Sequence, residues 1–320
     1  MIKEKKSRSK VWRRILLSIV LLVILCLNGI GLYFGNLLYQ EASLLNSHWN
    51  DRRLEQFKHS MNGDHRSQEW ADVVIDSRFG YPLHGTYIPN SQATDKTLIF
   101  LHGFAENRAF GSSYLDLYLD SGFNILLVDS RAHGESGGDS VTWGNYEKYD
   151  LDQWVSWVSG RFPTGVIGVH GVSMGAATAL MHAELNEPNK RVAFYVADSA
   201  YSDFEELLTL QMRQYFPEIA MPRLLLQYAN IVAYLHARFT FRQASPIRSV
   251  RQVTTPVLYI HGDADKLVPP SMSEELYRAT KGPRQLVIFP NTEHIAAIFD
   301  DRYRYRSVVQ RFVDSIESQG

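Results

Sequence analysis

Short apolar segments alternate with amphipathic ones through most of this 320-residue chain, and this alternation limits the folds that the chain can adopt. Eight segments have the length and apolar character of strands, namely 73–75, 81–88, 97–101, 124–128, 165–170, 192–196, 256–260 and 285–289. Helical spacing of apolar residues separates many of them, as at 146–158, 174–185 and 270–280. Strands that are apolar throughout and joined by helices form a parallel sheet covered on both faces. The sequence therefore predicts an α/β fold with a mostly parallel, eight-stranded sheet.

A charge-free stretch at residues 15–39 follows a basic segment at 1–14, which holds seven lysines and arginines against one glutamate. About 20 apolar residues suffice to cross a bilayer, and basic residues remain cytoplasmic. No Ala-x-Ala-like cleavage site follows Leu27, and a leucine precedes Cys26 where a lipoprotein signal would carry a small residue. We therefore predict a single-pass signal anchor in the cell membrane, with residues 69–320 as an extracytoplasmic domain.

Residues 40–68 join this anchor to the alternating region. Several apolar residues recur there near helical spacing: Leu44, Leu45, Trp49, Leu54 and Phe57. The pattern predicts a juxtamembrane helix or stalk. It leaves open whether this helix packs on the membrane surface or on the domain.

Residues 201–247 interrupt the alternation, because they contain no clear strand and are rich in Leu, Tyr, Phe and Met. We predict a helical cap inserted over the carboxyl edge of the sheet. One helix face cannot accommodate so many apolar side chains. Some of them should therefore line an apolar pocket.

The pentapeptide Gly171-Val-Ser173-Met-Gly175 lies between a predicted strand and a predicted helix. A turn of this kind is sharp and strained, lifts the serine hydroxyl clear of the sheet, and needs small residues two positions before and after the serine. The following helix N-terminus favours developing negative charge nearby. Ser173 is thus a candidate nucleophile, and a simple helix N-cap is the alternative.

A serine hydroxyl is a good nucleophile only when a base takes its proton. His294 follows the last predicted strand, and Asp265 follows the strand before it. The order serine, aspartate, histidine along the chain is one of the known triad orders. Asp198, which follows the strand at 192–196, is the alternative acid.

Several motifs lie just beyond predicted strands: His102-Gly-Phe104, Asp129-Ser-Arg-Ala-His133-Gly-Glu-Ser136, the serine pentapeptide, His261-Gly-Asp-Ala-Asp265-Lys-Leu-Val-Pro269 and His294. Together they resemble the α/β-hydrolase superfamily, and most closely its bacterial cell-envelope esterases and serine-aminopeptidase-like proteins. The resemblance covers residues 70–318 or so.

The resemblance implies an α/β-hydrolase fold with Ser173, Asp265 and His294 as the catalytic triad. Asp265 is the aspartate three residues after the glycine of the His-Gly-x-x-Asp motif. The resemblance also implies an oxyanion hole formed by the backbone N–H groups of Met174 and Phe104. The His-Gly-Phe loop lacks the longer glycine run of some lipases.

Other features of the sequence exclude several function classes. One cysteine cannot build a multi-cysteine metal site, no His-Glu-x-x-His occurs, and no Gly-x-Gly-x-x-Gly follows a strand. The net charge of −1 comes without a basic stripe. We therefore expect no metal, no cofactor and no nucleic-acid partner.

Polar residues beside the strand ends have a structural interpretation. We expect Asp129 and Arg131 to form a pair that fixes a loop. Four further histidines should hold loops through hydrogen bonds: His102, His133, His170 and His261.

The predicted activity is hydrolysis of an ester, thioester or amide through an acyl-enzyme on Ser173. A carboxylesterase acting on small-molecule or lipid-like acyl esters is the first hypothesis. A serine peptidase is the alternative within this class. A membrane-tethered binding module without catalysis is the alternative outside it, since a fold does not dictate a function.

Overall fold

The computed structural model describes residues 2–43, 48–63 and 70–318. Its centre is an eight-stranded sheet with the order β1-β2-β4-β3-β5-β6-β7-β8. The strands are β1 (Ala71–Asp76), β2 (Pro82–Ile88), β3 (Thr97–Leu101), β4 (Asn124–Val128), β5 (Ile167–Val172), β6 (Val192–Asp198), β7 (Val257–Gly262) and β8 (Arg284–Phe289). β2 is antiparallel to β1 and β4, and the remaining pairs are parallel. The predicted mostly parallel, eight-stranded sheet is confirmed.

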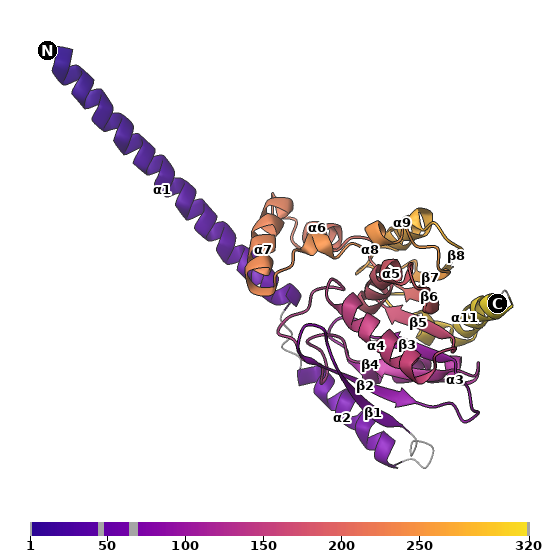
Figure 1. Cartoon of the computed structure of the whole chain (residues 1–320). Helices are drawn as coiled ribbons and strands as arrows, with labels where there is room; N and C mark the ends of the chain where they lie inside the picture. The colour runs from indigo at the N-terminus through magenta and orange to yellow at the C-terminus, as the bar shows by residue number, and fades with distance from the viewer. Residues whose placement is uncertain (1, 44–47, 64–69, 319–320) are drawn as a thin grey trace.

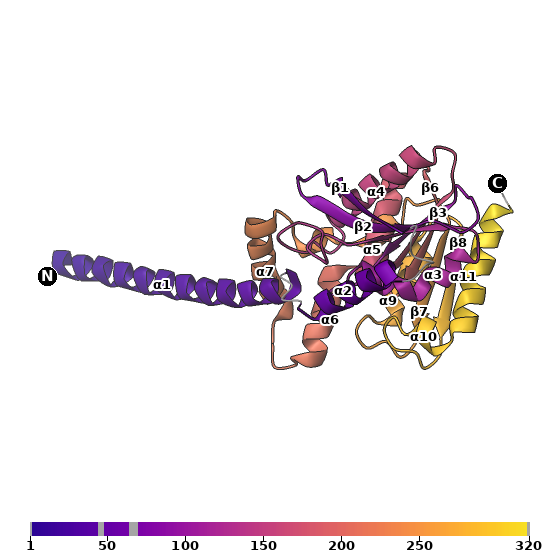
Figure 2. The same cartoon turned by 90° about the horizontal axis from the view of Figure 1, so that it is seen from below.

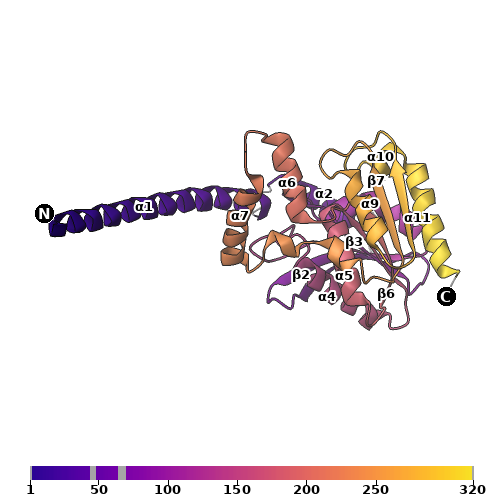
Figure 3. The ribbon, with the colours of Figure 1, turned by 90° about the horizontal axis from the view of Figure 1, so that it is seen from above.

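Helices cover both faces of this sheet (Figure 1). One face carries α4 (Glu147–Arg161), α5 (Met174–Asn186), α8 (Pro246–Ser249) and α9 (Pro270–Ala279). The other face carries α2 (His48–Gly63), η2 (Arg108–Tyr114), α3 (Leu115–Leu119), α10 (Ala297–Asp300) and α11 (Arg302–Glu317). In the view from above, β7 lies between α9 and α11 (Figure 3).

The central strands are buried because both of their faces are covered. Successive side chains of a strand point to opposite faces. In β4, Ile125 and Leu127 pack toward α3 and α11, whereas Leu126 and Val128 pack toward α4 and α5. This double burial explains why the strands are apolar throughout rather than at alternate positions.

α2 packs on the domain, which answers the question that the sequence left open. Leu54 and Phe57 are buried in the core on the α11 side of the sheet. Arg53 pairs with Glu106 at 2.7 Å, and Lys58 pairs with Glu135. The side chains of three residues in the predicted pattern, Leu44, Leu45 and Trp49, lie outside the described part of the chain.

α1 (Ile2–Ser43) is one continuous helix that leaves the body as a rod, so the two termini lie at opposite ends of the molecule (Figure 2). The predicted N-terminal apolar helix is confirmed. It extends past the predicted limit of residue 39, and its Val11–Ser43 portion is long and apolar enough to cross a membrane. Tyr39 and Ala42 are buried against the cap, so the end of α1 belongs to the packed body.

The predicted insertion at residues 201–247 is helical and contains α6 (Phe204–Tyr215), α7 (Pro222–Ala237) and η3 (Phe241–Gln243), with the start of α8 at its end. The Asp203 side chain caps α6 by accepting from the Glu206 N–H at 3.2 Å. α7 begins at Pro222, where the missing N–H costs no helical hydrogen bond. Both helices are amphipathic, and their buried faces share one apolar cluster with the end of α1.

Candidate active site

Ser173 occupies a strained turn between β5 and α5. Its backbone angles are φ 53° and ψ −117°, and its own N–H donates to the Asp198 carbonyl at 2.8 Å. A Cβ atom on Gly171 would lie 2.2 Å from the Gly175 carbonyl oxygen, and one on Gly175 would lie 2.4 Å from the Leu101 carbonyl oxygen. Only glycine therefore fits at these two positions. The Ser173 side chain makes no capping hydrogen bond to α5, which removes the N-cap interpretation.

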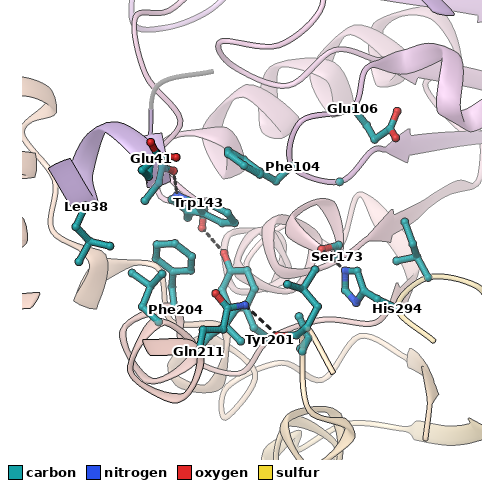
Figure 4. A pocket seen from close by; sticks show the side chains of 17 residues that line it. Leu38, Glu41, Phe104, Glu106, Trp143, Ser173, Tyr201, Phe204, Gln211 and His294 are labelled. Atoms are coloured by element: carbon teal, nitrogen blue, oxygen red, sulfur yellow. Dashed lines mark hydrogen bonds between the residues drawn. The ribbon is translucent and has the colours of Figure 1, made fainter. Parts of the chain in front are cut away.

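His294 lies against this serine. The Ser173 hydroxyl donates to Nε2 of His294 at 2.9 Å, and Nδ1 of His294 donates to Oδ2 of Asp265 at 2.6 Å. Figure 4 shows the His294 ring beside Ser173 at one end of a pocket. The structure thus brings together the three side chains that the resemblance implied.

The end of β7 determines where the His294 loop runs. A Cβ atom on Gly262 would lie 2.1 Å from the Thr292 carbonyl oxygen, so the two loops touch through backbone atoms. The Asp263 carboxylate accepts from the Asn291 N–H at 2.6 Å. Asp263 is therefore a turn residue that holds the His294 loop to the loop carrying Asp265.

Asp265 is buried and accepts four hydrogen bonds. Oδ1 accepts from the Leu267 and Val268 N–H groups, both at 2.9 Å. Oδ2 accepts from His294 and from Nε2 of His261, the latter at 3.0 Å. Burial would raise the pKa of Asp265, but the hydrogen bonds from His261, His294 and Val268 hold that pKa well below its usual range. The carboxylate is therefore charged at neutral pH and can orient the imidazole.

His261 has a closer relation to the site than the sequence indicated. The Ser273 hydroxyl lies 2.7 Å from Nδ1 of His261, which leaves Nε2 to donate to Asp265 and, at 2.9 Å, to the Val268 carbonyl. The sequence predicted that His261 holds a loop, but it did not predict the hydrogen bond from His261 to Asp265. The available signal was its place four residues before Asp265 in the same motif.

Asp198 serves a different network. Its Oδ2 accepts from the Tyr305 hydroxyl at 2.8 Å, and its Oδ1 accepts from the Ser199 hydroxyl at 2.8 Å. Burial raises the pKa of Asp198, and the bonds from Tyr305 and Ser199 oppose that rise. Within the described ranges it makes no hydrogen bond to His294. Asp265, and not Asp198, is the carboxylate that contacts the histidine.

A pocket of about 410 Å³ opens above Ser173 and His294 (Figure 4). Its walls are mainly apolar, and the ring of Trp143 stacks between Phe104 at 4.6 Å and Phe204 at 4.0 Å. The cap contributes three apolar side chains, Phe204, Leu207 and Leu208, as predicted for part of the insertion. α1 contributes Leu38, Glu41 and Ala42.

Residues 98–305 match the family described as the alpha/beta hydrolase family. The chain belongs to this family. It is 35% identical over 259 residues to the uncharacterized protein YqkD of Bacillus subtilis, covering 81% of this chain and 84% of that protein. It is 26% identical to the uncharacterized protein YfhR of Escherichia coli K12, covering 75% and 79% of the two chains.

Solved structures agree with the family membership. The esterase Pf2001 of Pyrococcus furiosus superposes with a TM-score of 0.62 at 27% identity, covering 77% of this chain and 92% of the esterase. The alpha/beta hydrolase GrgF of Penicillium sp. sh18 superposes with a TM-score of 0.61 at 21% identity, covering 78% and 98%. The second likeness concerns the fold alone. The family and the esterase neighbour support hydrolase activity for this α/β hydrolase.

Two backbone N–H groups of this α/β hydrolase are candidates for the oxyanion hole. Met174 is the first residue of α5, and Phe104 lines the pocket on the loop after β3. That loop passes close to the serine, because a Cβ atom on Gly103 would lie 3.4 Å from the Cβ of Ser173. In the part of the chain that the structure describes, neither N–H has a protein acceptor. Both are therefore free to donate to a substrate oxygen.

Three predicted structural histidines of the hydrolase are buried and neutral at pH 7. Burial lowers the pKa of His102 to about 4, and that of His133 and of His170 to about 3. Nε2 of His102 accepts from the Ser130 N–H at 3.0 Å, and Nε2 of His133 accepts from the Ala105 N–H at 3.2 Å. His102 and His133 hold loops around the site as expected, whereas His170, on β5, contacts the hydroxyls of Tyr118 on α3 and Tyr305 on α11 at 2.9 and 3.1 Å and holds no loop.

The predicted pair of Asp129 with Arg131 is wrong. The carboxylate of Asp129 binds the buried guanidinium of Arg108 and accepts from the Arg108 N–H at 2.7 Å. Arg131 donates instead to the Ser140 carbonyl at 2.8 Å and lies over the ring of Tyr81. The Arg108 side chain is only 1% exposed and needs a charged partner, which Asp129 supplies. Arg108 was not linked to the Asp129 motif because it lies 21 residues earlier.

The possible metal ligands of this hydrolase are spread apart among the residues that the structure describes. No group of three or more His, Cys, Asp or Glu side chains in the described ranges could hold a metal ion. The chemistry that the site offers is that of a serine hydroxyl, an imidazole and an ionised carboxylate in hydrogen-bonded order. This arrangement suits nucleophilic attack on an acyl carbon.

Proposed function

We propose that this α/β hydrolase cleaves acyl esters through an acyl-enzyme on Ser173. The observation that carries the proposal is the continuous hydrogen-bonded line from the Ser173 hydroxyl through His294 to Asp265. In this mechanism Nε2 of His294 takes the hydroxyl proton while Oγ attacks the carbonyl carbon. Asp265 holds the imidazole in the required tautomer and stabilises its cation.

The acyl-enzyme then forms and breaks down in two stages, and in each stage His294 takes up one proton and gives one back. The tetrahedral oxyanion accepts hydrogen bonds from the N–H groups of Met174 and Phe104. Its collapse expels the alkoxide, which receives the proton from His294 and leaves as an alcohol. A water molecule attacks the acyl-enzyme, again losing its proton to His294, and the carboxylic acid is released as Ser173 regains its hydrogen.

The apolar pocket favours a carboxylesterase over a peptidase. An acyl chain fits walls built from Phe104, Trp143, Phe204, Leu207 and Leu208. A peptide would instead require partners for its backbone N–H and C=O groups. The similarity to the Pyrococcus furiosus esterase supports the same choice.

We expect the enzyme to prefer medium acyl chains to acetyl. Each methylene that is buried fully contributes up to about 0.8 kcal/mol, so kcat/KM should rise by about tenfold or more from acetyl to hexanoyl esters. Leu208→Ala should flatten this rise, because Leu208 lines the pocket. A series of p-nitrophenyl esters from acetyl to decanoyl measures the profile.

Leu210→Ala is the matched control for that series. Leu210 lies on the same helix, is also partly buried against the cap core, and does not line the pocket. It should leave the chain-length profile unchanged. A flat wild-type profile, or equal effects of the two substitutions, would show that α6 does not select the acyl chain.

We further propose that α1 anchors the enzyme in the cell membrane with the hydrolase domain outside the cytoplasm. The proposal rests on the apolar length of α1 and on the seven basic residues in segment 1–14.

Protease added to cells whose envelope admits it should therefore remove the domain beyond residue 43 while a cytoplasmic marker remains intact. The remaining fragment should stay in the membrane fraction. Full protection of the domain under these conditions would place it in the cytoplasm.

A further inference from the structure

α7 carries a row of apolar side chains on the side away from the cap core. Leu224, Ile231 and Leu235 are 47%, 49% and 64% exposed. With the half-buried Tyr228 they have the spacing of a single helix face. These four residues are called the α7 row below. The opposite face of the helix is buried in the cap, and α1 contacts the row at Tyr228.

α1 crosses α7 in all three views of the ribbon (Figures 1, 2 and 3). A Cβ atom on Gly31 or Gly35 would lie 2.4 or 2.7 Å from atoms of Tyr228, so two glycines allow this close approach. The Tyr228 hydroxyl also donates to Oδ1 of Asn28 at 3.1 Å. α7 is thereby fixed to α1 between residues 28 and 35.

This contact point coincides with the expected end of the membrane-spanning length of α1. Residues 11–30 are exposed on all sides, and the charge-free stretch starts at Ile15. About 20 helical residues cover about 30 Å, which is the thickness of the hydrocarbon core. Counted from Ile15, that length ends near Phe34. α7 must then lie at the boundary between lipid and water.

The last turns of α1 lead from α7 to the pocket. Leu38 and Ala42 line the pocket, and the Trp143 indole N–H donates to the Ala42 carbonyl at 2.7 Å. These residues follow Phe34 by four and eight positions, or about 6 and 12 Å along the helix axis. One wall of the pocket therefore lies within about 12 Å of the membrane boundary.

We propose that the α7 row rests in the bilayer that α1 crosses, and that the pocket takes its ester from that bilayer. The substrate class is then an acyl lipid resident in the membrane rather than a dissolved ester. The inference rests on the proposed anchoring of α1 and, for its substrate, on the proposed hydrolysis at Ser173.

A bilayer suits the row better than a second protein does. The space beside α1 at the level of Phe34 is filled by lipid, and the row flanks α1 at this level. The exposed residues around it include Tyr234 on α7 and Arg238 just after it. Arg223 stands at the other end of α7 and contacts Glu206 at 3.4 Å. Tyrosine and arginine beside an apolar row are typical of the lipid headgroup region.

Fluorescence quenching in proteoliposomes tests the position of the row independently of catalysis. The full-length chain in a Cys26→Ser background would carry Ile231→Cys, labelled with an environment-sensitive dye. Tyr303→Cys on α11, where the native side chain is 90% exposed, is the control. The label at 231 should shift to shorter wavelength and be quenched by brominated lipids, while the label at 303 should be quenched by iodide in water.

Two results would overturn the position of the row. Quenching of the label at 231 by iodide, as at 303, would place the row in water. Shielding at 231 from both iodide and brominated lipids would show that a protein, such as a second copy of the chain, covers it.

Substrate source is tested with two esters in the same vesicles, one a fluorogenic diacylglycerol embedded in the bilayer and one a water-soluble butyrate. Ile231→Gln/Leu235→Gln should lower hydrolysis of the embedded ester by about tenfold and of the soluble ester by less than about twofold, since interfacial binding scales with buried apolar area. Val74→Gln/Tyr303→Gln, which alters two exposed apolar residues far from α1, should change neither rate.

The outcomes separate this inference from the proposed function. Unchanged hydrolysis of the embedded ester, or equal loss on both esters, would overturn delivery from the bilayer. If wild type cleaves neither ester and does not react with a fluorophosphonate, the proposed hydrolysis fails, and the quenching experiment still decides where the row lies.

Discussion

Ser173→Ala is expected to lower ester turnover by about 10³-fold or more while the protein stays folded. In the proposed mechanism the Ser173 hydroxyl forms the acyl bond, and its removal leaves the pocket and the candidate oxyanion donors in place. kcat with a medium-chain ester is the quantity to measure, together with the melting temperature.

Ser249→Ala is the matched control for this loss. Ser249 is also buried, but its hydroxyl donates to Glu184 at 2.7 Å, and Ser249 does not line the pocket. Its removal should cost some stability and leave kcat nearly unchanged. Turnover by Ser173→Ala close to that of wild type would exclude the proposed nucleophile.

Asp265→Asn is expected to reduce kcat by about 10⁴-fold. The amide cannot accept a hydrogen bond at every position where the carboxylate now does, and it favours the wrong tautomer of His294. The loss should appear in kcat more than in KM, because Asp265 does not line the pocket.

Asp198→Asn provides the comparison, since Asp198 is also buried and is the last residue of the central strand β6. The change disturbs the bonds from Tyr305 and Ser199, which should cost about 1–3 kcal/mol of stability. Activity should fall much less than in Asp265→Asn. A larger loss of kcat in Asp198→Asn would move the acid role to Asp198.

The sequence predicted the sheet well because a strand that is buried on both faces consists mainly of apolar residues. Runs such as 98–101 and 125–128 are apolar at every position, and each lies in a central strand. The serine turn was recognisable for a similar reason. Gly171 and Gly175 are required by backbone contacts so short that no side chain fits.

Contacts between distant segments could not be predicted in the same way. The pairing of Arg108 with Asp129 depends on η2 lying beside the end of β4, and no spacing rule indicates it. The extension of α1 into the pocket wall is of the same kind. From the sequence, Leu38 belongs to the end of the anchor and Ala42 to the start of the stalk. Their place in the pocket wall could not be predicted, because their partners, Trp143 and the cap, are distant along the chain.

The role of His261 was missed because hydrogen-bond direction is not visible in a motif. Its Nε2 contacts Asp265 because Ser273, on α9, occupies its other nitrogen. The sequence contained both residues, but only the packing of α9 against β7 places them together.

Covalent labelling with a fluorophosphonate tests most directly whether Ser173 is an activated nucleophile. The full-length protein would be treated with the probe, and the adduct located by mass spectrometry of its peptides. The account predicts a single adduct on Ser173, lost in Ser173→Ala and formed much more slowly in His294→Gln. An unlabelled but folded wild-type protein, under conditions where a reference serine esterase reacts completely, would contradict the account and indicate a binding module without catalysis.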